Sequence, residues 1–196
     1  MALNKEKISR STLPTGYGMF TIYGFQDAAT GEEAVALVHG DVSAPSVPLV
    51  RVHSQCLTGD VFGSERCDCG VQLRTALKKI AAETAGILLY QMQEGRGIGL
   101  INKLLAYELQ DRGVDTVEAN ERLGFAADQR KYHFCAEILK HLGVSELRLL
   151  SNNPAKKEGL DQEGVRVAAL VPLKVSHSRS ADSYMRTKRE KLGHLL

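Results

Sequence analysis

Apolar runs typical of buried strands alternate with helical spacing over much of this 196-residue chain. Between 71 and 83, Leu73, Leu77 and Ile80 recur at the spacing of one helix face, and the run 86–90 reads as a buried strand. Further helices are expected at about 99–112, at 128–142 and ending near 164, with strands at 147–150 and 165–170. This alternation favours an α/β fold with a mixed, mainly parallel sheet flanked by helices.

The first quarter of the chain has a different pattern. The ranges 17–25, 34–39 and 47–53 read as strands with no helical segment between them, which predicts a small N-terminal β meander. No internal repeat or low-complexity tract divides the rest, so we expect a single domain over residues 1–196. The tail 177–196 is polar and basic and is expected to be partly helical.

Composition excludes several classes of protein. The formal charge is +2, from 25 Lys and Arg against 23 Asp and Glu, so no polycationic surface for a long nucleic acid is expected. Residues 1–7 lack the apolar core of a signal peptide, so we expect no secretory signal, and no segment approaches the roughly 18 continuous apolar residues of a membrane span. With four cysteines and no secretory signal, we expect a cytoplasmic location.

Three of those cysteines, Cys56, Cys67 and Cys69, fall within a short segment rich in Gly, Asp and Ser. Cys67 and Cys69 are too close in sequence for a comfortable disulfide, so a shared metal suits them better. A catalytic zinc takes three protein ligands and leaves a fourth position open. The cluster therefore predicts a catalytic zinc site. His53 is expected to contact a ligand, or to support the metal ligands, instead of binding the metal itself, and Cys135, on an apolar helical stripe, to be a buried hydrophobe.

A glycine-rich turn follows the strand 86–90 and leads into a helix. Backbone N–H groups in such a turn can hold phosphate oxygens, and Arg96 could clamp one bidentately. By itself the turn fits a flexible helix entry equally well. Support comes from other segments that follow strands, because Arg51, Arg96, Arg130 and Lys156 would suit a polyphosphate if they converged. Asp128 begins an expected helix and could be only an N-cap.

Together these segments resemble GTP cyclohydrolase II. The resemblance rests on Arg51-Val-His-Ser-Gln-Cys56, on Arg66-Cys-Asp-Cys-Gly70 and on the segments 93–100, 115–120, 123–128 and 152–154. It runs from about residue 12 to residue 194. It implies a zinc-dependent homodimer that uses Mg²⁺ with the GTP phosphates. Such an enzyme opens the guanine ring of GTP in the first step of riboflavin synthesis, releasing formate and pyrophosphate and leaving a diaminopyrimidinone ribosylamino phosphate.

The resemblance also assigns the site residues. One zinc ion per subunit would be held by Cys56, Cys67 and Cys69, and its bound water, with a pKa lowered to about 7, would attack C8 of guanine. GTP would be contacted by Arg51, Val52, His53, Ser54, Gln55, Gln72, Glu94, Gly95, Arg96, Thr116, Ser151 and Lys156.

Three catalytic roles follow from the same resemblance. Tyr107 would assist ring opening, Asp128 would accept a proton and Arg130 would attack the α-phosphorus. A guanidinium with a pKa above ~12 is a poor nucleophile, so we expect Arg130 mainly to clamp phosphate.

Two positions depart from the expected family pattern. Gln55 stands where a glutamate is expected in His-Ser-Glu-Cys, which removes a charge, and Ser151 replaces an expected threonine but keeps the hydroxyl. Gln55 keeps open a paralogue that hydrolyses GTP incompletely or serves another pathway. A zinc-stabilised nucleotide-binding or RNA-binding module is the non-enzymatic alternative, and the near-neutral charge counts against it.

Overall fold

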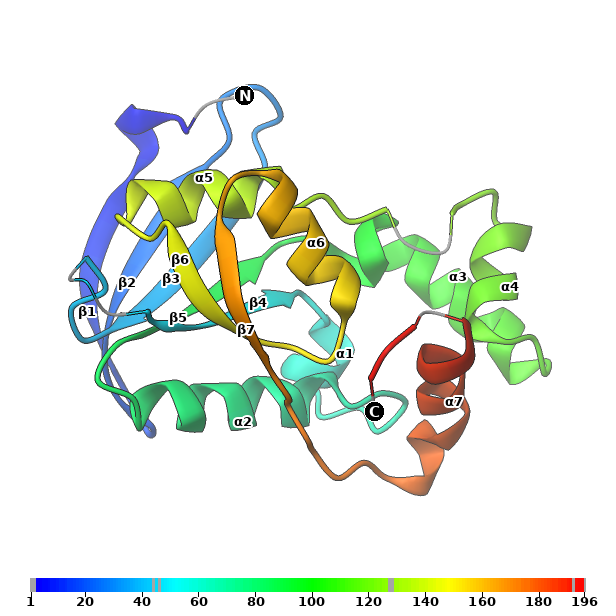
Figure 1. Ribbon diagram of the computed structural model, residues 1–196. Helices are drawn as coiled ribbons and strands as arrows, with labels where there is room; N and C mark the ends of the chain where they lie inside the picture. The colour runs from blue at the N-terminus through cyan, green and yellow to red at the C-terminus, as the bar shows by residue number, and fades with distance from the viewer. Residues whose placement is uncertain (1–2, 44, 46, 127–128, 192, 196) are drawn as a thin grey trace. The chain divides into compact units, whose positions relative to one another are not determined.

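The structure is a computed structural model that describes residues 3–43, 45, 47–126, 129–191 and 193–195 (Figure 1). The chain divides into two compact units. The sheet unit comprises residues 1–53, 74–92 and 131–173, and the helical unit comprises residues 54–73, 93–130 and 174–196. The single domain expected over 1–196 stays a prediction.

The sheet unit is built on a seven-stranded mixed sheet. Its strand order is β1 (Ser9–Thr15), β2 (Gly18–Gln26), β3 (Glu33–His39), β5 (Gly86–Gln91), β4 (Leu49–Ser54), β6 (Glu146–Leu150) and β7 (Arg166–Val171). The pairs β1–β2, β2–β3 and β3–β5 are antiparallel. The pairs β4–β6 and β6–β7 are parallel, so these strands end at the same edge. The predicted α/β class, with a mixed sheet and antiparallel N-terminal strands, is confirmed.

The N-terminal meander contains one strand that the sequence did not indicate. β1 pairs with β2 along its whole length, whereas the strand expected at 47–53, β4, lies between β5 and β6. Most of β1 is exposed, because it forms one edge of the sheet. An exposed edge strand needs no alternation of apolar and polar residues, and Pro14 is tolerated at such an edge. Periodicity therefore could not reveal this strand.

Helices of the sheet unit pack around an apolar core. They are η1 (Lys5–Lys7), α5 (His133–His141), α6 (Pro154–Gln162) and the second part of α2 (Cys69–Ala81), which begins in the helical unit. Cys135, Ile138 and Leu139 of α5 are fully buried with the side chains of the central strands. Burial raises the pKa of the Cys135 thiol, and the expectation that Cys135 is a buried hydrophobe is confirmed.

The helical unit contains α1 (Leu57–Asp60), the start of α2, η2 (Glu94–Gly97), α3 (Leu100–Asp111), α4 (Thr116–Arg122), η3 (Arg179–Ala181) and α7 (Asp182–Lys191). Figure 1 shows α3, α4 and α7 grouped together. The helix expected at 99–112 and the partly helical tail are confirmed. Helix α4 was not expected, although Asp115 is a strong N-cap whose Oδ1 accepts hydrogen bonds from the backbone of Val117 and Glu118. In the described part of the chain, every helix is too short or too polar to cross a bilayer.

Candidate functional site

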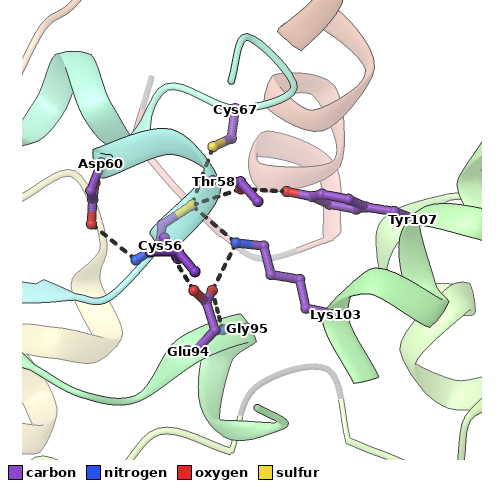
Figure 2. Close-up of polar contacts among 9 residues, drawn as sticks. Cys56, Thr58, Asp60, Cys67, Glu94, Gly95, Lys103 and Tyr107 are labelled. Carbon is purple, nitrogen blue, oxygen red and sulfur yellow. Dashed lines mark hydrogen bonds and ion pairs between the residues drawn. The ribbon is translucent and has the colours of Figure 1, made fainter. Parts of the chain in front are cut away.

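The three predicted zinc ligands lie together in the helical unit. Cys56 immediately precedes α1, Cys67 lies in the loop that follows, and Cys69 begins α2. Their Sγ atoms all lie within 4.8 Å of one another, and the Sγ atoms of Cys56 and Cys67 are 3.7 Å apart (Figure 2). Gly59 makes this approach possible, because a Cβ there would lie 3.2 Å from the Sγ atoms of both Cys56 and Cys67.

The donor set fits zinc. Two thiolates bound tetrahedrally at about 2.3 Å from one zinc ion lie roughly 3.8 Å apart, which matches the spacing of Cys56 and Cys67. Among the described residues, the metal-ligating group consists of these three thiols, without a histidine or carboxylate. His53 belongs to the sheet unit, where its ring stacks on Tyr90 with centroids 5.5 Å apart. The cluster is therefore suited to an ion with one coordination position left for another ligand.

Contacts among the three thiols lower the pKa of one cysteine and raise the pKa of the other two. Hydrogen bonds from Cys67 and Cys69, together with the charge of Lys103, lower the pKa of Cys56. The contact with Cys56 raises the pKa of Cys67 to about 11, and contacts with both other thiols raise the pKa of Cys69. One thiolate is thus stabilised in the absence of metal, while a bound cation would have to displace protons from the other two.

A buried lysine contacts the cluster. Lys103 Nζ donates to the Sγ of Cys56 at 3.2 Å and to Oε1 of Glu94 at 2.7 Å (Figure 2). Burial opposes the charge of Lys103, but the Cys56 thiolate and Glu94 raise its pKa overall, so it stays a cation. Sequence reasoning missed Lys103. The signal that could have found it is its place one helical turn before Tyr107 on the same face of α3.

Tyr107 lies beside the cysteines, as its predicted role requires. Its hydroxyl shares a hydrogen bond of 3.1 Å with the hydroxyl of Thr58, a residue of α1 (Figure 2). The guanidinium of Arg66 lies over the Tyr107 ring, with Cζ 4.8 Å from the centroid. Burial raises the pKa of Tyr107, so its phenol remains protonated at neutral pH.

The glycine-rich turn is a strained, ordered element. Gly95 and Arg96 both have φ 62°, which is unfavourable for an arginine. The buried Glu94 carboxylate fixes the turn, because Oε1 accepts from the Gly95 backbone at 2.8 Å and Oε2 accepts from the Leu57 backbone at 2.7 Å. Within the described residues, Nη2 of Arg96 is buried and has no hydrogen-bond acceptor. Strain at a residue with an unused donor is typical of a ligand-binding position.

Three other predicted site residues of the helical unit, Gln72, Thr116 and Arg130, are buried or half-buried. Gln72 of α2 is nearly buried, and its side-chain amide donates to Oδ2 of Asp68, the residue between Cys67 and Cys69. Thr116 is the first residue of α4 and is half-buried. Arg130 is half-buried in the segment before α5, and Asp128 lies outside the described residues. The structure therefore leaves the roles of Asp128 and Arg130 as predictions.

A second group of predicted residues gathers in the sheet unit, where the parallel strands β4 and β6 end. Arg51 is buried and its Nη1 donates to the carbonyl of Leu150 at 3.0 Å. Lys156 of α6 is also buried, and its Nζ donates to the carbonyl of Val52 at 2.7 Å. Ser151, at the end of β6, accepts a hydrogen bond from the Asn153 backbone. Arg51 lies within β4, Ser151 follows β6 and Lys156 lies in α6, and their predicted contacts with GTP stay predictions.

Ser54, the last residue of β4, and Gln55 directly precede Cys56, and both are half-buried. Ser54 Oγ is buried and, among the described residues, has no hydrogen-bond partner. Such a hydroxyl is available to a ligand, as its predicted contact with GTP requires.

A triad of thiols with an open position, supported by a buried cation and a tyrosine, defines a candidate metal-dependent hydrolase site. The family model for GTP cyclohydrolase II matches residues 6–172. The chain belongs to the GTP cyclohydrolase II family and is therefore a hydrolase of that family.

Curated relatives agree with this assignment. A GTP cyclohydrolase-2 of Pseudomonas putida is 56% identical over 96% of this chain and 92% of its own length. A GTP cyclohydrolase-2 of Escherichia coli is 54% identical over 97% of both chains. A riboflavin biosynthesis protein of Vibrio vulnificus is 54% identical over 96% of this chain, which spans 51% of that longer protein.

Proposed function

We propose that this chain hydrolyses GTP, opens the imidazole ring of guanine and releases formate and pyrophosphate. The product would be a diaminopyrimidinone ribosylamino phosphate, and the reaction would be the first step of riboflavin biosynthesis. The observation that carries the proposal is the triad of thiols at zinc spacing, one ligand short of a closed site, in a member of this family. A purely structural zinc would call for a fourth protein ligand.

Cys56, Cys67 and Cys69 would hold one zinc ion per subunit. When bound, zinc supplies a Lewis acid and a water of lowered pKa, which is the nucleophile that attack on C8 of guanine requires. Three thiolates around Zn²⁺ carry a net charge of −1, and the ammonium of Lys103 at 3.2 Å from Cys56 offsets it. Lys103 thereby favours the build-up of negative charge on the substrate during the reaction.

Tyr107 would act as a proton donor or relay during ring opening. Its raised pKa keeps the proton on Oη, and the hydrogen bond with Thr58 orients that atom. Asp128 would accept a proton. Arg130 would clamp phosphate electrostatically, and a guanylyl adduct on Arg130 in mass spectra of quenched enzyme would contradict this role.

GTP would be contacted by the residues that the family resemblance assigns to it. Arg96 offers the unused Nη2 and Ser54 an unused hydroxyl, and Gln72, Glu94, Gly95 and Thr116 are further contacts that the resemblance assigns. The resemblance also assigns Arg51, Val52, His53, Gln55, Ser151 and Lys156 to GTP. Mg²⁺ would neutralise the triphosphate during loss of pyrophosphate.

Two further expectations belong to the same proposal. A homodimer follows from the family resemblance, and a row of exposed apolar side chains on α3, Ile101, Leu104 and Leu105, offers a surface that a second copy would cover. Sedimentation equilibrium tests the dimer. A cytoplasmic location follows from the cysteine content and is tested by fractionation.

One assay tests the reaction. Zinc-loaded protein is incubated with GTP and Mg²⁺, and formate, pyrophosphate and the absorbance of the pyrimidine are followed, with Cys67→Ser as the control that breaks the triad. Formate and pyrophosphate in equal amounts, lost in Cys67→Ser, support the proposal. Absence of formate overturns it. Formate with a different nucleotide product would identify the paralogue that Gln55 leaves open.

A further inference from the structure

The C-terminal helix α7 lies beyond the residues that the family model matches, yet it contacts the functional elements of the helical unit. Although α7 is strongly polar, Met185, Thr187 and Lys188 are each less than 9% exposed. A buried lysine on a terminal helix is costly unless a partner offsets its charge. The partner of Lys188 is Asp68, which links α7 to the cysteine cluster.

Lys188 binds the carboxylate that lies between two of the predicted zinc ligands. Its Nζ donates to Oδ1 of Asp68, the residue between Cys67 and Cys69 in the sequence. The side chain of Asp68 is fully buried. Oδ2 of the same carboxylate accepts from the amide of Gln72. One ion pair therefore fixes the backbone that carries two thiols and the orientation of a predicted GTP-binding amide.

Tyr184, one turn earlier on α7, contacts the strained arginine of the glycine-rich turn. Cζ of Arg96 lies 5.5 Å from the Tyr184 ring centroid, and Nζ of Lys188 lies 4.7 Å from it. Cation–π contact holds a guanidinium without using its N–H donors. The contact thus orients Arg96 while its buried Nη2 stays available to an anion.

A third contact ties the end of α7 to the helix that carries Thr116. Lys191 Nζ lies 2.6 Å from Oδ2 of Asp115, the N-cap of α4. This pair is exposed, so it adds orientation more than stability. The three contacts together connect α7 with the cysteine loop, the glycine-rich turn and α4.

We propose that Lys188 and Tyr184 are positioning residues for the hydrolysis of GTP. Lys188 fixes the zinc-binding segment through Asp68, and Tyr184 holds Arg96 in the pose that binds phosphate. The proposal rests on the proposed function for its link to GTP, whereas its link to zinc can be measured without turnover.

The test of Lys188 compares Lys188→Met with Lys188→Arg, and uses the exposed neighbour Arg189→Met as the matched control. Competition with a chromophoric chelator should show zinc bound about 10-fold to 100-fold more weakly in Lys188→Met, with recovery in Lys188→Arg and no change in Arg189→Met. If Lys188→Met does not fold, the double variant Asp68→Asn with Lys188→Met is measured in its place, because it removes both charges of the buried pair. Zinc affinity equal to that of the unsubstituted protein would overturn the role of Lys188.

The test of Tyr184 compares Tyr184→Leu with Tyr184→Phe. Tyr184→Leu should raise KM for GTP by about 3-fold to 30-fold with kcat and zinc content nearly unchanged, and Tyr184→Phe, which keeps the ring, should restore KM. Equal KM in all three proteins, or an equal loss in both variants, overturns the role of Tyr184. If the unsubstituted protein releases no formate, the proposed function fails, whereas the zinc comparison still decides the role of Lys188.

Discussion

The ammonium of Lys103 lies 3.2 Å from the Sγ of Cys56 and joins a predicted zinc ligand to the carboxylate of Glu94. The pair is buried, with side-chain exposures of 10% for Lys103 and 7% for Glu94. In such surroundings a charge without its partner is strongly disfavoured. Glu94, which resemblance assigns to GTP, therefore also has a structural task, because the same carboxylate fixes the backbone of Leu57 and Gly95.

We expect Lys103→Met to weaken zinc binding by about 10-fold to 100-fold and to lower kcat. The reason is that the Cys56 thiolate and Glu94 lose their shared cation. Lys103→Arg should recover part of the affinity, and Lys79→Met, an exposed lysine of α2, serves as the control. Titration against a chromophoric chelator measures the affinity, and an unchanged value for Lys103→Met would show that the contact has no role in metal binding.

We expect Tyr107→Phe to lower kcat by about 10²-fold to 10⁴-fold while zinc content stays the same, since the change removes the proton at Oη and keeps the ring. Thr58→Val removes the other side of the same hydrogen bond and leaves the phenol in place. Its effect on kcat should be smaller and in the same direction. Steady-state formate release and metal analysis provide the two measurements, and full activity in Tyr107→Phe would refute a proton-transfer role.

The sequence predicted the parts of this chain that repeat a pattern. The helix expected at 99–112 is α3, and the strand expected from the apolar run 86–90 is β5, each within one or two residues. The three thiols were predicted to share a metal because the cysteines are clustered in the sequence and because three is the number of protein ligands that a catalytic zinc takes.

Contacts between segments that are distant in the sequence could not be predicted from a local pattern. Lys103 reads as an ordinary helix lysine until α3 brings it against Cys56, and Lys188 reads as part of a basic tail until α7 brings it against Asp68. Gly59 is likewise required only because two thiols lie 3.2 Å from the place of its missing Cβ. Each of these roles depends on tertiary packing, which local pattern does not encode.

Gln55→Glu should reveal what the missing charge does. Gln55 directly precedes Cys56 and is half-buried, and the family resemblance leads us to expect a glutamate there. If that carboxylate orients Mg²⁺ or ribose, Gln55→Glu should raise kcat/KM, with the gain largest at low Mg²⁺ concentration. Gln162→Glu, at an exposed residue of α6, controls for the added charge. Unchanged kcat and KM at every Mg²⁺ concentration would dismiss the idea that Gln55 limits turnover.

Zinc binding should release about two protons per site at neutral pH. In the metal-free protein, the pKa of Cys67 is raised to about 11 and that of Cys69 is also raised, whereas the pKa of Cys56 is lowered. Cys67 and Cys69 are therefore protonated at pH 7 and must lose their protons when they bind the ion, so affinity should rise with pH. Below the pKa of both thiols, the logarithm of the association constant should increase by about two per pH unit.

The proton count can be measured by calorimetry in buffers of different ionisation enthalpy. Cys67→Ser removes one of the two thiols that carry a proton, so its residual zinc binding should be weaker and should release about one proton. Cys135→Ala changes a cysteine of the sheet unit that lies outside the triad, and it should leave the count at about two. Release of fewer than one proton by the unsubstituted protein would mean that the thiols are already ionised without metal, and that Lys103 and its neighbours stabilise more than one thiolate.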